Sequence, residues 1–360
     1  DPKIVSVNTV DAHSDHKYFE SLAEFSEGEM KLRQSLNGKW KIHYAQNTNQ
    51  VLKDFYKTEF DETDLNFINV PGHLELQGFG SPQYVNTQYP WDGKEFLRPP
   101  QVPQESNAVA SYVKHFTLND ALKDKKVFIS FQGVATSIFV WVNGNFVGYS
   151  EDSFTPSEFE ISDYLVEGDN KWAVAVYRYS TASWLEDQDF WRLYGIFRDV
   201  YLYAIPKVHV QDLFVKGDYD YQTKAGQLDI DLKTVGDYED KKIKYVLSDH
   251  EGIVTEGDAS VNADGELYVS LEGLQIKPWS AESPKLYNLT LHVLDDDQVV
   301  EVVPVKVGFR HFEIKDKLML LNGKRIVFKG VNRHEFNART GRCITCLLYT
   351  SPSPRDRQKS

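Results

Sequence analysis

Apolar and polar residues alternate along many short stretches of this chain of 360 residues. Trp40-Lys41-Ile42-His43-Tyr44 and Gln227-Leu228-Asp229-Ile230-Asp231-Leu232 each place every second side chain on one face. An apolar residue at every second position is typical of a β-strand with one buried face. Residues 18–36 contain a weak helical pattern, and no stronger one occurs elsewhere. The sequence therefore predicts a mainly β fold.

Turn signals divide these stretches into two blocks. Asn143-Gly144 stands between apolar stretches and is the strongest short signal for a β-hairpin. Residues 1–205, with an N-terminal extension to about residue 30, are predicted to form a jelly-roll sandwich. After Pro206, residues 206–309 are predicted to form an immunoglobulin-like β-sandwich without its disulfide. Its expected strands lie near 208–216, 227–234, 241–249, 252–257, 266–272, 286–294 and 299–307, and a hairpin about Asn322-Gly323 is expected within 315–330.

Composition and charge narrow the classes of function. Hydrophobic residues make up 41% of the chain and charged residues 26%, which predicts a buried core rather than disorder. The formal net charge of −13 repels phosphate backbones, so nucleic acid is not an expected partner. The longest apolar stretch, 127–142, is interrupted by polar residues and is too short to span a bilayer, so no membrane is expected either. The aromatic content of 13% suits both β-strands and the flat faces on which sugars stack.

The cysteines and the chain ends bear on location and on which residues are native. Two cysteines, Cys343 and Cys346, exclude a disulfide scaffold, and with no visible signal peptide a cytoplasmic location is expected. The chain begins with Asp1, so we expect an incomplete N-terminus, which leaves a lost signal peptide open. Cys346 to Ser351 can be back-translated into the transposon end used for sequencing libraries. We interpret residues 346–360 as translated adaptor, with a genuine polar tail as the alternative.

Two segments carry candidate chemistry. Residues 184–191 place three carboxylates between two tryptophans, and a sugar site needs this combination of acceptors and flat apolar faces. A solvated acidic loop, or a strand end that Arg192 and Arg198 neutralise, explains the same residues. Residues 329–335, Lys-Gly-Val-Asn-Arg-His-Glu, follow a strand, and in barrel enzymes polar residues at such a strand end form the active site. A turn with a hydrogen-bonded histidine is equally consistent with that segment.

These segments belong to a set of eight motifs that occur in order between about residues 3 and 345. The motifs are Leu36-Asn-Gly-Lys-Trp40, Val70-Pro-Gly-His73, Tyr84-Val-Asn-Thr-Gln-Tyr-Pro90, Pro156-Ser-Glu-Phe159, Trp184-Leu-Glu-Asp-Gln-Asp-Phe-Trp-Arg192, Gly195-Ile-Phe-Arg-Asp-Val200, Val307-Gly-Phe-Arg310 and Gly330-Val-Asn-Arg-His-Glu335. The set resembles glycoside hydrolase family 2, and most of all its large β-galactosidases. The resemblance implies a jelly-roll sugar-binding domain, an immunoglobulin-like domain and a TIM-barrel catalytic domain, of which residues 310–345 would be the truncated start, its first hairpin and strand.

The resemblance also implies three substrate-binding residues. Asn86 matches a position that hydrogen-bonds galactose. Asp189 matches one that binds a galactose hydroxyl and ligates a sodium ion, two tasks that suit an acceptor-only, hard oxygen. His334 matches a barrel-strand histidine that contacts the sugar. From the residues alone, a turn residue, an ion-pair partner and a core histidine remain alternative interpretations of these three positions.

The resemblance places the catalytic residues outside this chain. Retaining glycosidases need two carboxyl groups about 5–5.5 Å apart, and the family's two glutamates lie on later barrel strands, as do most of its magnesium (Mg2+) ligands. A TIM barrel needs about 250 residues, whereas residues 310–345 supply only its beginning. We therefore interpret the chain as an inactive N-terminal fragment of a β-galactosidase, which at full length would hydrolyse β-galactosides such as lactose as a homo-oligomer. A parent β-glucuronidase or β-mannosidase, and a stand-alone carbohydrate-binding or subunit-contact protein, remain alternatives.

Overall fold

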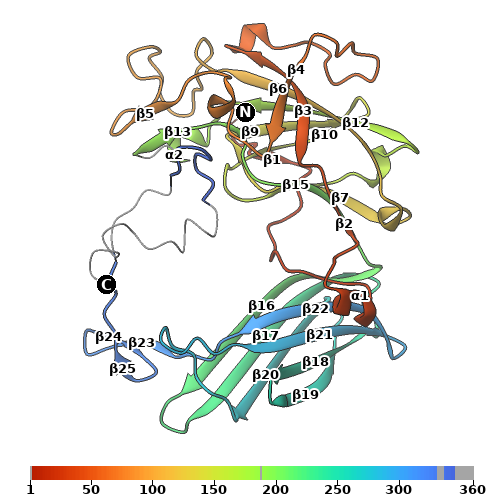
Figure 1. Cartoon of the computed structure of the whole chain (residues 1–360), viewed down its shortest axis with the longest axis vertical. Helices are drawn as coiled ribbons and strands as arrows, with labels where there is room; N and C mark the ends of the chain where they lie inside the picture. The colour runs from red at the N-terminus through yellow and green to blue at the C-terminus, as the bar shows by residue number, and fades with distance from the viewer. Residues whose placement is uncertain (1, 187–188, 331–335, 345–360) are drawn as a thin grey trace. The chain divides into compact units, whose positions relative to one another are not determined.

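The computed structural model describes residues 2–186, 189–330 and 336–344, which form two units (Figure 1). Within these described ranges, unit 1 contains residues up to 12, 33–204 and 336–344. Unit 2 contains residues 13–32 and 205–330. No helix in the described part of the chain is long and apolar enough to cross a membrane. The adaptor interpretation of residues 346–360 lies outside the described residues.

Unit 1 is built on two larger antiparallel sheets and two short ladders. The seven-stranded sheet has the order β1 (Ser6–Val7), β10 (Asn145–Glu151), β9 (Ser137–Val142), β12 (Asp169–Tyr177), β6 (Val109–Thr117), β3 (Gly38–Ala45), β4 (Asn66–Val70). The four-stranded sheet has the order β11 (Ser157–Glu160), β7 (Lys126–Phe131), β15 (Val200–Ile205), β2 (Arg33–Ser35). The short ladders pair β13 (Phe190–Arg192) with β5 (Gln83–Val85) and β14 (Gly195–Ile196) with β8 (Val134–Ala135). Helical turns are α2 (Ser183–Glu186), η1 (Thr48–Gln50), η2 (Glu75–Gln77), η3 (Asp120–Leu122) and η4 (Ser162–Tyr164).

The core of unit 1 lies between the two larger sheets. Ile138, Val140 and Val142 alternate along β9 and are at most 1% exposed. Trp172 of β12 and Phe131 of β7 meet edge to face across the layers, with ring centroids 6.4 Å apart. A sheet whose inner face is this apolar must bury it against a second sheet, because exposed apolar area costs about 25 cal/mol per Å². The alternation read from the sequence is therefore the cause of the two-layer sandwich.

The outer face of the seven-stranded sheet is partly covered as well. Phe55 packs on Val109, Val113, Ala173 and Ala175 of β6 and β12, and further apolar residues between 51 and 65 join this cluster. The covering segment lies between β3 and β4 in the sequence and has no strand of its own. The β9–β10 hairpin turns at Asn143-Gly144 with φ of 49° and 83°, as Asn-Gly predicts for a tight turn.

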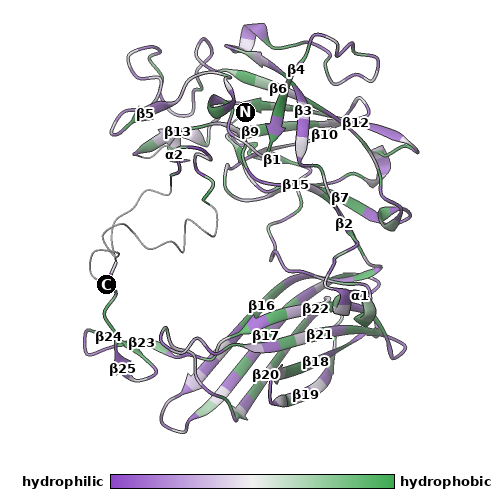
Figure 2. Ribbon diagram, in the orientation of Figure 1, coloured by the Kyte–Doolittle hydropathy of each residue, from purple (hydrophilic) through white to green (hydrophobic). Residues whose placement is uncertain are grey.

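Unit 2 is a second sandwich of two antiparallel sheets. One sheet has the order β16 (Val208–Asp220), β17 (Ala225–Gly236), β20 (Glu266–Leu274). The other has the order β19 (Gly252–Ser260), β18 (Lys242–Asp249), β21 (Tyr287–Asp295), β22 (Gln298–Val307). All seven expected strands are present, and Figure 2 shows hydrophobic and hydrophilic bands alternating along them. The mainly β prediction is confirmed, and Leu228, Ile230 and Leu232 are the buried set in β17.

Residues 13–32 differ from the expected assignment to the first domain, because they belong to unit 2. Phe19 forms an antiparallel bridge with Val302 of β22 and is 3% exposed. The backbone N–H of Ser14 donates to Asp212 at 2.8 Å. The weak helical pattern yields only α1 (Leu22–Glu27), capped by the Ser21 hydroxyl, which accepts from the Glu24 N–H at 3.2 Å. The backbone bridge of Phe19 and the hydrogen bond of Ser14 therefore attach this segment to unit 2, although it precedes unit 1's main part in the sequence.

After unit 2's last long strand the chain forms a small three-stranded sheet. It consists of β23 (Phe312–Lys315), β24 (Leu318–Leu321) and β25 (Lys324–Arg325). Asn322 and Gly323 form the expected turn between β24 and β25, with φ of 51° and 75°. Ile314 is 71% exposed, so this sheet buries little of its apolar surface within the described residues.

A buried pair joins the two sheets of unit 2 and gives a stability prediction. Glu301 of β22 is 0% exposed, lies 2.5 Å from His209 Nδ1 of β16, and accepts from the Val210 N–H at 2.9 Å. Glu301→Ala should lower the free energy of unfolding of unit 2 by about 3–5 kcal/mol, because both partners stay buried without an acceptor. Hydrogen exchange of the β16 and β22 amides measures this. As a control, Glu256→Ala removes an exposed pair with Lys244 and should cost less than about 1 kcal/mol; equal effects would contradict the prediction.

Candidate functional site

The β5–β13 ladder brings together two of the three predicted substrate-binding residues. Its register pairs Val85 with Phe190, Tyr84 with Trp191 and Gln83 with Arg192. Asn86 directly follows β5 and Asp189 directly precedes β13, so the two are the next positions of the same antiparallel register. Both are exposed, and Figure 1 shows the two strands side by side. An amide and a carboxylate therefore stand at one end of the ladder, open to a ligand.

Tyr84 holds the carboxylate of Asp189. Its hydroxyl donates to Asp189 Oδ1, and this bond raises the pKa of the phenol above its ordinary value. The Tyr84 ring lies 5.6 Å from that of Trp191, which is 39% exposed. Trp191 also stacks on Phe336, with ring centroids 5.9 Å apart and an angle of 23° between the ring planes. Sequence reasoning missed Tyr84, although its place two residues before Asn86 puts it on the same face of β5.

Other parts of the predicted site divide into structural and undescribed residues. Trp184 does not offer a free stacking face: its ring packs on Tyr89 at 4.6 Å and on Trp91 at 4.9 Å, and its Nε1–H donates to the Gln101 carbonyl. Glu186 accepts from both the N–H and the hydroxyl of Ser153 at 2.7 Å, so it fastens a loop. Asp187 and His334 lie outside the described residues, and the role of His334 stays a prediction.

A buried polar layer within unit 1 supports the ladder. Arg178 donates to Gln83 of β5 at 3.3 Å, and its guanidinium lies 4.7 Å from the ring of Tyr194. Glu75, 9% exposed, accepts from the Tyr194 N–H at 2.9 Å. Burial raises the pKa of Glu75 to about 7. No sequence signal marks Glu75, because only the fold places this carboxyl inside.

The segment 336–344 docks on a buried histidine of the same unit. His73 is 2% exposed and stacks on Phe197 at 5.2 Å and 13°. Burial lowers the pKa of His73 to about 3, so its ring is neutral and Nε2 accepts from the Arg342 N–H at 3.1 Å. Gly341 has a φ of 65°, and a Cβ there would overlap the His73 ring. A glycine is required at this close approach.

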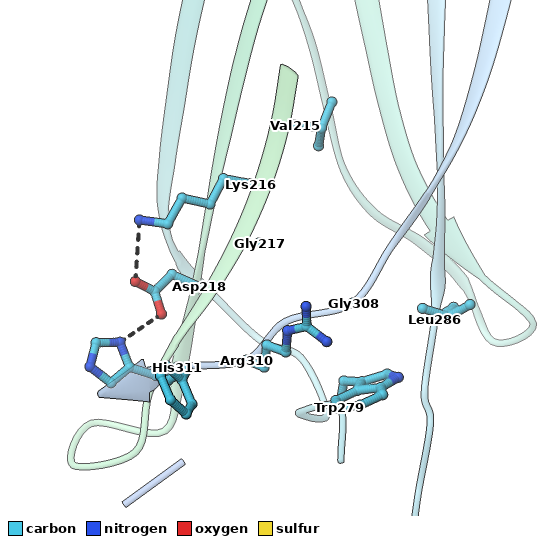
Figure 3. A pocket seen from close by; sticks show the side chains of 10 residues that line it. Val215, Lys216, Gly217, Asp218, Trp279, Leu286, Gly308, Arg310 and His311 are labelled. Carbon is cyan, nitrogen blue, oxygen red and sulfur yellow. Dashed lines mark hydrogen bonds and ion pairs between the residues drawn. The ribbon is translucent and has the colours of Figure 1, made fainter. Parts of the chain in front are cut away.

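Unit 2 contains a hollow of about 490 Å³ at the ends of its strands (Figure 3). The guanidinium of Arg310 lies over Trp279, 4.8 Å from the ring centroid. Asp218 is bound by His311 at 2.9 Å and approached by Lys216 at 3.8 Å. It is the one carboxylate among the described lining residues, and it already has partners. This hollow lacks the two carboxyl groups that a retaining glycosidase needs.

Family models match nearly the whole described chain. The glycosyl hydrolases family 2 sugar binding domain matches residues 33–206, the central family 2 domain residues 208–310, and the family 2 TIM barrel domain residues 312–350. The chain belongs to glycosyl hydrolase family 2. This confirms the family that the eight motifs indicated.

Curated relatives of this family 2 chain are β-galactosidases. One from Streptococcus thermophilus is 97% identical over 345 residues, which is 96% of this chain and 34% of that protein. One from Clostridium acetobutylicum is 52% identical, and the match covers 38% of that protein. The "Beta-galactosidase large subunit" of Leuconostoc lactis is 43% identical, and the match covers 57% of that protein. The chain thus spans about a third of the length of the first two relatives.

Solved structures agree on the fold. A β-glucuronidase from Bifidobacterium dentium superposes with a TM-score of 0.70 at 17% identity, over 89% of this chain and 55% of that one. A β-glycosidase from Bacteroides vulgatus gives a TM-score of 0.67 at 22% identity, over 87% and 38%. At these identities the likeness concerns the fold and not the substrate.

The buried Glu75 gives a pH prediction for unit 1. The pKa of Glu75 is about 7 in the folded protein, whereas its ordinary value is 4.5. The folded state is therefore destabilised progressively as the pH rises from 4.5 to 7. With Glu75 present, the free energy of unfolding of unit 1 should fall by about 3 kcal/mol as the pH rises from 4.5 to above 7. Glu75→Gln cannot ionise, so this fall should be absent in the variant. Urea unfolding followed by tryptophan fluorescence at pH 5 and pH 8 measures it. Exposed Glu167→Gln is the control, and a pH slope unchanged by Glu75→Gln would contradict the prediction.

Proposed function

We propose that this chain is the N-terminal part of a β-galactosidase that removes terminal, non-reducing β-D-galactose from β-galactosides such as lactose. The observation that carries the proposal is the placement of Asn86 and Asp189 at one end of the β5–β13 ladder. The 97% identity with a β-galactosidase supports the substrate. The glucuronidases among the structural neighbours add support for the fold only.

In this proposal the ladder forms one wall of the galactose pocket. The Asn86 amide can donate and accept, and the Asp189 carboxylate accepts from sugar hydroxyls. The exposed part of the Trp191 ring offers apolar surface beside them. His334 would contact the sugar from the barrel side, as the resemblance implies. Together these groups bind and orient the galactose ring without taking part in bond cleavage.

Asp189 is also our candidate sodium ligand. Tyr84 engages its Oδ1, and the described residues supply no partner to Oδ2, so one hard anionic oxygen is available for a cation. A bound sodium ion would supply a fixed positive charge for sugar hydroxyls. One carboxylate cannot complete a coordination shell, so the remaining ligands would come from elsewhere. The part of the chain that the structure describes contains no cluster of three or more His, Cys, Asp or Glu that could hold a metal ion.

We place the catalytic glutamates outside this chain and expect the chain alone to be inactive. A retaining mechanism needs an acid/base and a nucleophilic carboxyl group about 5–5.5 Å apart. The match covers only 34% of the Streptococcus thermophilus relative and 38% of the Clostridium acetobutylicum relative, which leaves room for both glutamates. We further propose that the full-length protein is a cytoplasmic homo-oligomer. The name of the Leuconostoc lactis relative indicates a subunit partner for that protein.

The first test replaces Asp189 in a full-length enzyme carrying this N-terminal part. Asp189→Ala should lower kcat/KM for lactose roughly ten- to hundredfold, because a hydrogen bond to a charged group contributes about 1.5–3 kcal/mol. It should also abolish the response of activity to sodium. Asp163→Ala, an exposed acid in η4, is the matched control. An unchanged sodium response in Asp189→Ala would remove the metal assignment.

The second test separates the carboxylate from its orientation. Tyr84→Phe keeps the ring on Trp191 and removes the hydroxyl that holds Asp189. We expect KM for lactose to rise roughly three- to tenfold with little change in kcat, as expected for the loss of one hydrogen bond. Tyr268→Phe, an exposed tyrosine of unit 2, serves as control. A lower kcat with unchanged KM would show that Tyr84 acts in another way.

A further inference from the structure

A second hollow, called the groove below, lies on the outer face of the seven-stranded sheet, and no residue of β5 or β13 lines it. It measures about 680 Å³, within the range of about 300–1,000 Å³ typical of small-molecule sites. The sheet register places Tyr149 of β10 opposite Phe139 of β9, and Tyr177 of β12 opposite Ser137 of β9. The rings of Tyr149 and Tyr177 lie 4.4 and 5.4 Å from that of Phe139. Three aromatic rings thus stand together on one sheet face.

The segment between β3 and β4 covers the neighbouring part of the same sheet face, but not the groove. Trp141 also lies on the outer face, but Tyr56 stacks on it at 5.3 Å and 14°, and Phe55 meets its edge at 5.7 Å. The covering segment does not extend over the groove. There Phe146 is 43% exposed, and Tyr149 and Tyr177 are half-buried. The described chain therefore leaves aromatic surface uncovered where the groove runs.

The polar groups of the groove are fixed in place. Glu151 Oε2 accepts from the Thr181 hydroxyl at 2.6 Å and from the Ala182 N–H at 2.7 Å, while Oε1 accepts from the Tyr149 hydroxyl. The hydroxyl of Ser180, a buried lining residue, has no partner among the described residues. A carboxylate held by three donors presents its remaining lone pairs in a constant direction.

The charge of the groove restricts what it can hold. Glu151 is its one charged lining residue in the described chain, and no Lys, Arg or His lines it. An anionic ligand would meet an uncompensated carboxylate, whereas a neutral ligand rich in hydroxyl donors would not. A sugar ring has such hydroxyls on its edge and C–H groups on its faces, which stack on aromatic rings.

We propose that this groove is a second carbohydrate-binding site, which takes a neutral pyranose or a short neutral oligosaccharide. One sugar ring stacks on the Phe139–Tyr149–Tyr177 platform, and a hydroxyl on its edge donates to Glu151. The groove shares no residue with the Asn86–Asp189 site, so the proposal does not depend on the function of that site.

The test uses the whole 360-residue chain and saturation-transfer difference NMR with millimolar lactose. Wild type should give a saturation-transfer signal, and Phe146→Ser and Glu151→Gln should each weaken binding roughly five- to tenfold. Phe146 is exposed and Gln keeps the shape of Glu151, so both variants should fold, which circular dichroism checks. Asp189→Ala removes lactose bound at the Asn86–Asp189 site, so the signal that remains in this variant reports the groove. Asp163→Ala, an exposed acid in η4 outside both sites, is the matched control and should keep the whole signal. Glucuronate should bind at least tenfold more weakly than lactose.

Three results would overturn the proposal. One is the absence of any lactose signal with wild type. Another is loss of the signal in Asp189→Ala with both groove variants unaffected, which would support the Asn86–Asp189 site and leave the groove without a ligand. The third is equal binding of glucuronate and lactose, because it contradicts the charge argument on which the choice of ligand rests.

Discussion

The antiparallel pairing of β5 with β13 is the constraint on which the candidate site depends. Neither strand exceeds three residues, and the two come from segments about a hundred residues apart. A ladder this short has little stability of its own, since isolated two-stranded ribbons are marginal in water. Its support comes from the polar layer beneath, where Arg178 reaches Gln83 and Glu75 bonds the backbone of Tyr194. The site is thus an exposed edge held by a buried scaffold.

That scaffold contains two groups with opposite preferences for pH. His73 is kept neutral by burial, and an unfolded histidine takes up a proton below about pH 6.5, so it costs stability on the acid side. Glu75 prefers its proton when buried, so it costs stability on the alkaline side. The two penalties leave unit 1 best balanced in between. Both groups lie within the unit that carries the proposed sugar-binding wall.

Most of the fold could be predicted from the sequence, because strand periodicity and Asn-Gly turns are local signals. β17 alternates so regularly that its buried set could be read directly, and the turns at residues 143 and 322 followed from their Asn-Gly pairs. The position of residues 13–32 could not, because it depends on Phe19 finding Val302 nearly three hundred residues away. Asn86 and Asp189 came from motif resemblance. Their pairing, and the packing of Trp184 on Tyr89 and Trp91 that removes it as a stacking face, required the fold.

The distribution of the two units along the chain has a consequence for how the protein is made. The polypeptide passes between the units four times, at about residues 12, 32 and 204 and again between residues 330 and 336. During synthesis the first piece of unit 2, which carries Phe19, leaves the ribosome long before β22 exists to receive it. Unit 2 therefore cannot close until nearly the whole described chain has been translated. A cut in the gene at Pro206 would leave residues 13–32, which belong to unit 2, on the product that carries unit 1, so neither sandwich corresponds to one continuous stretch of the chain.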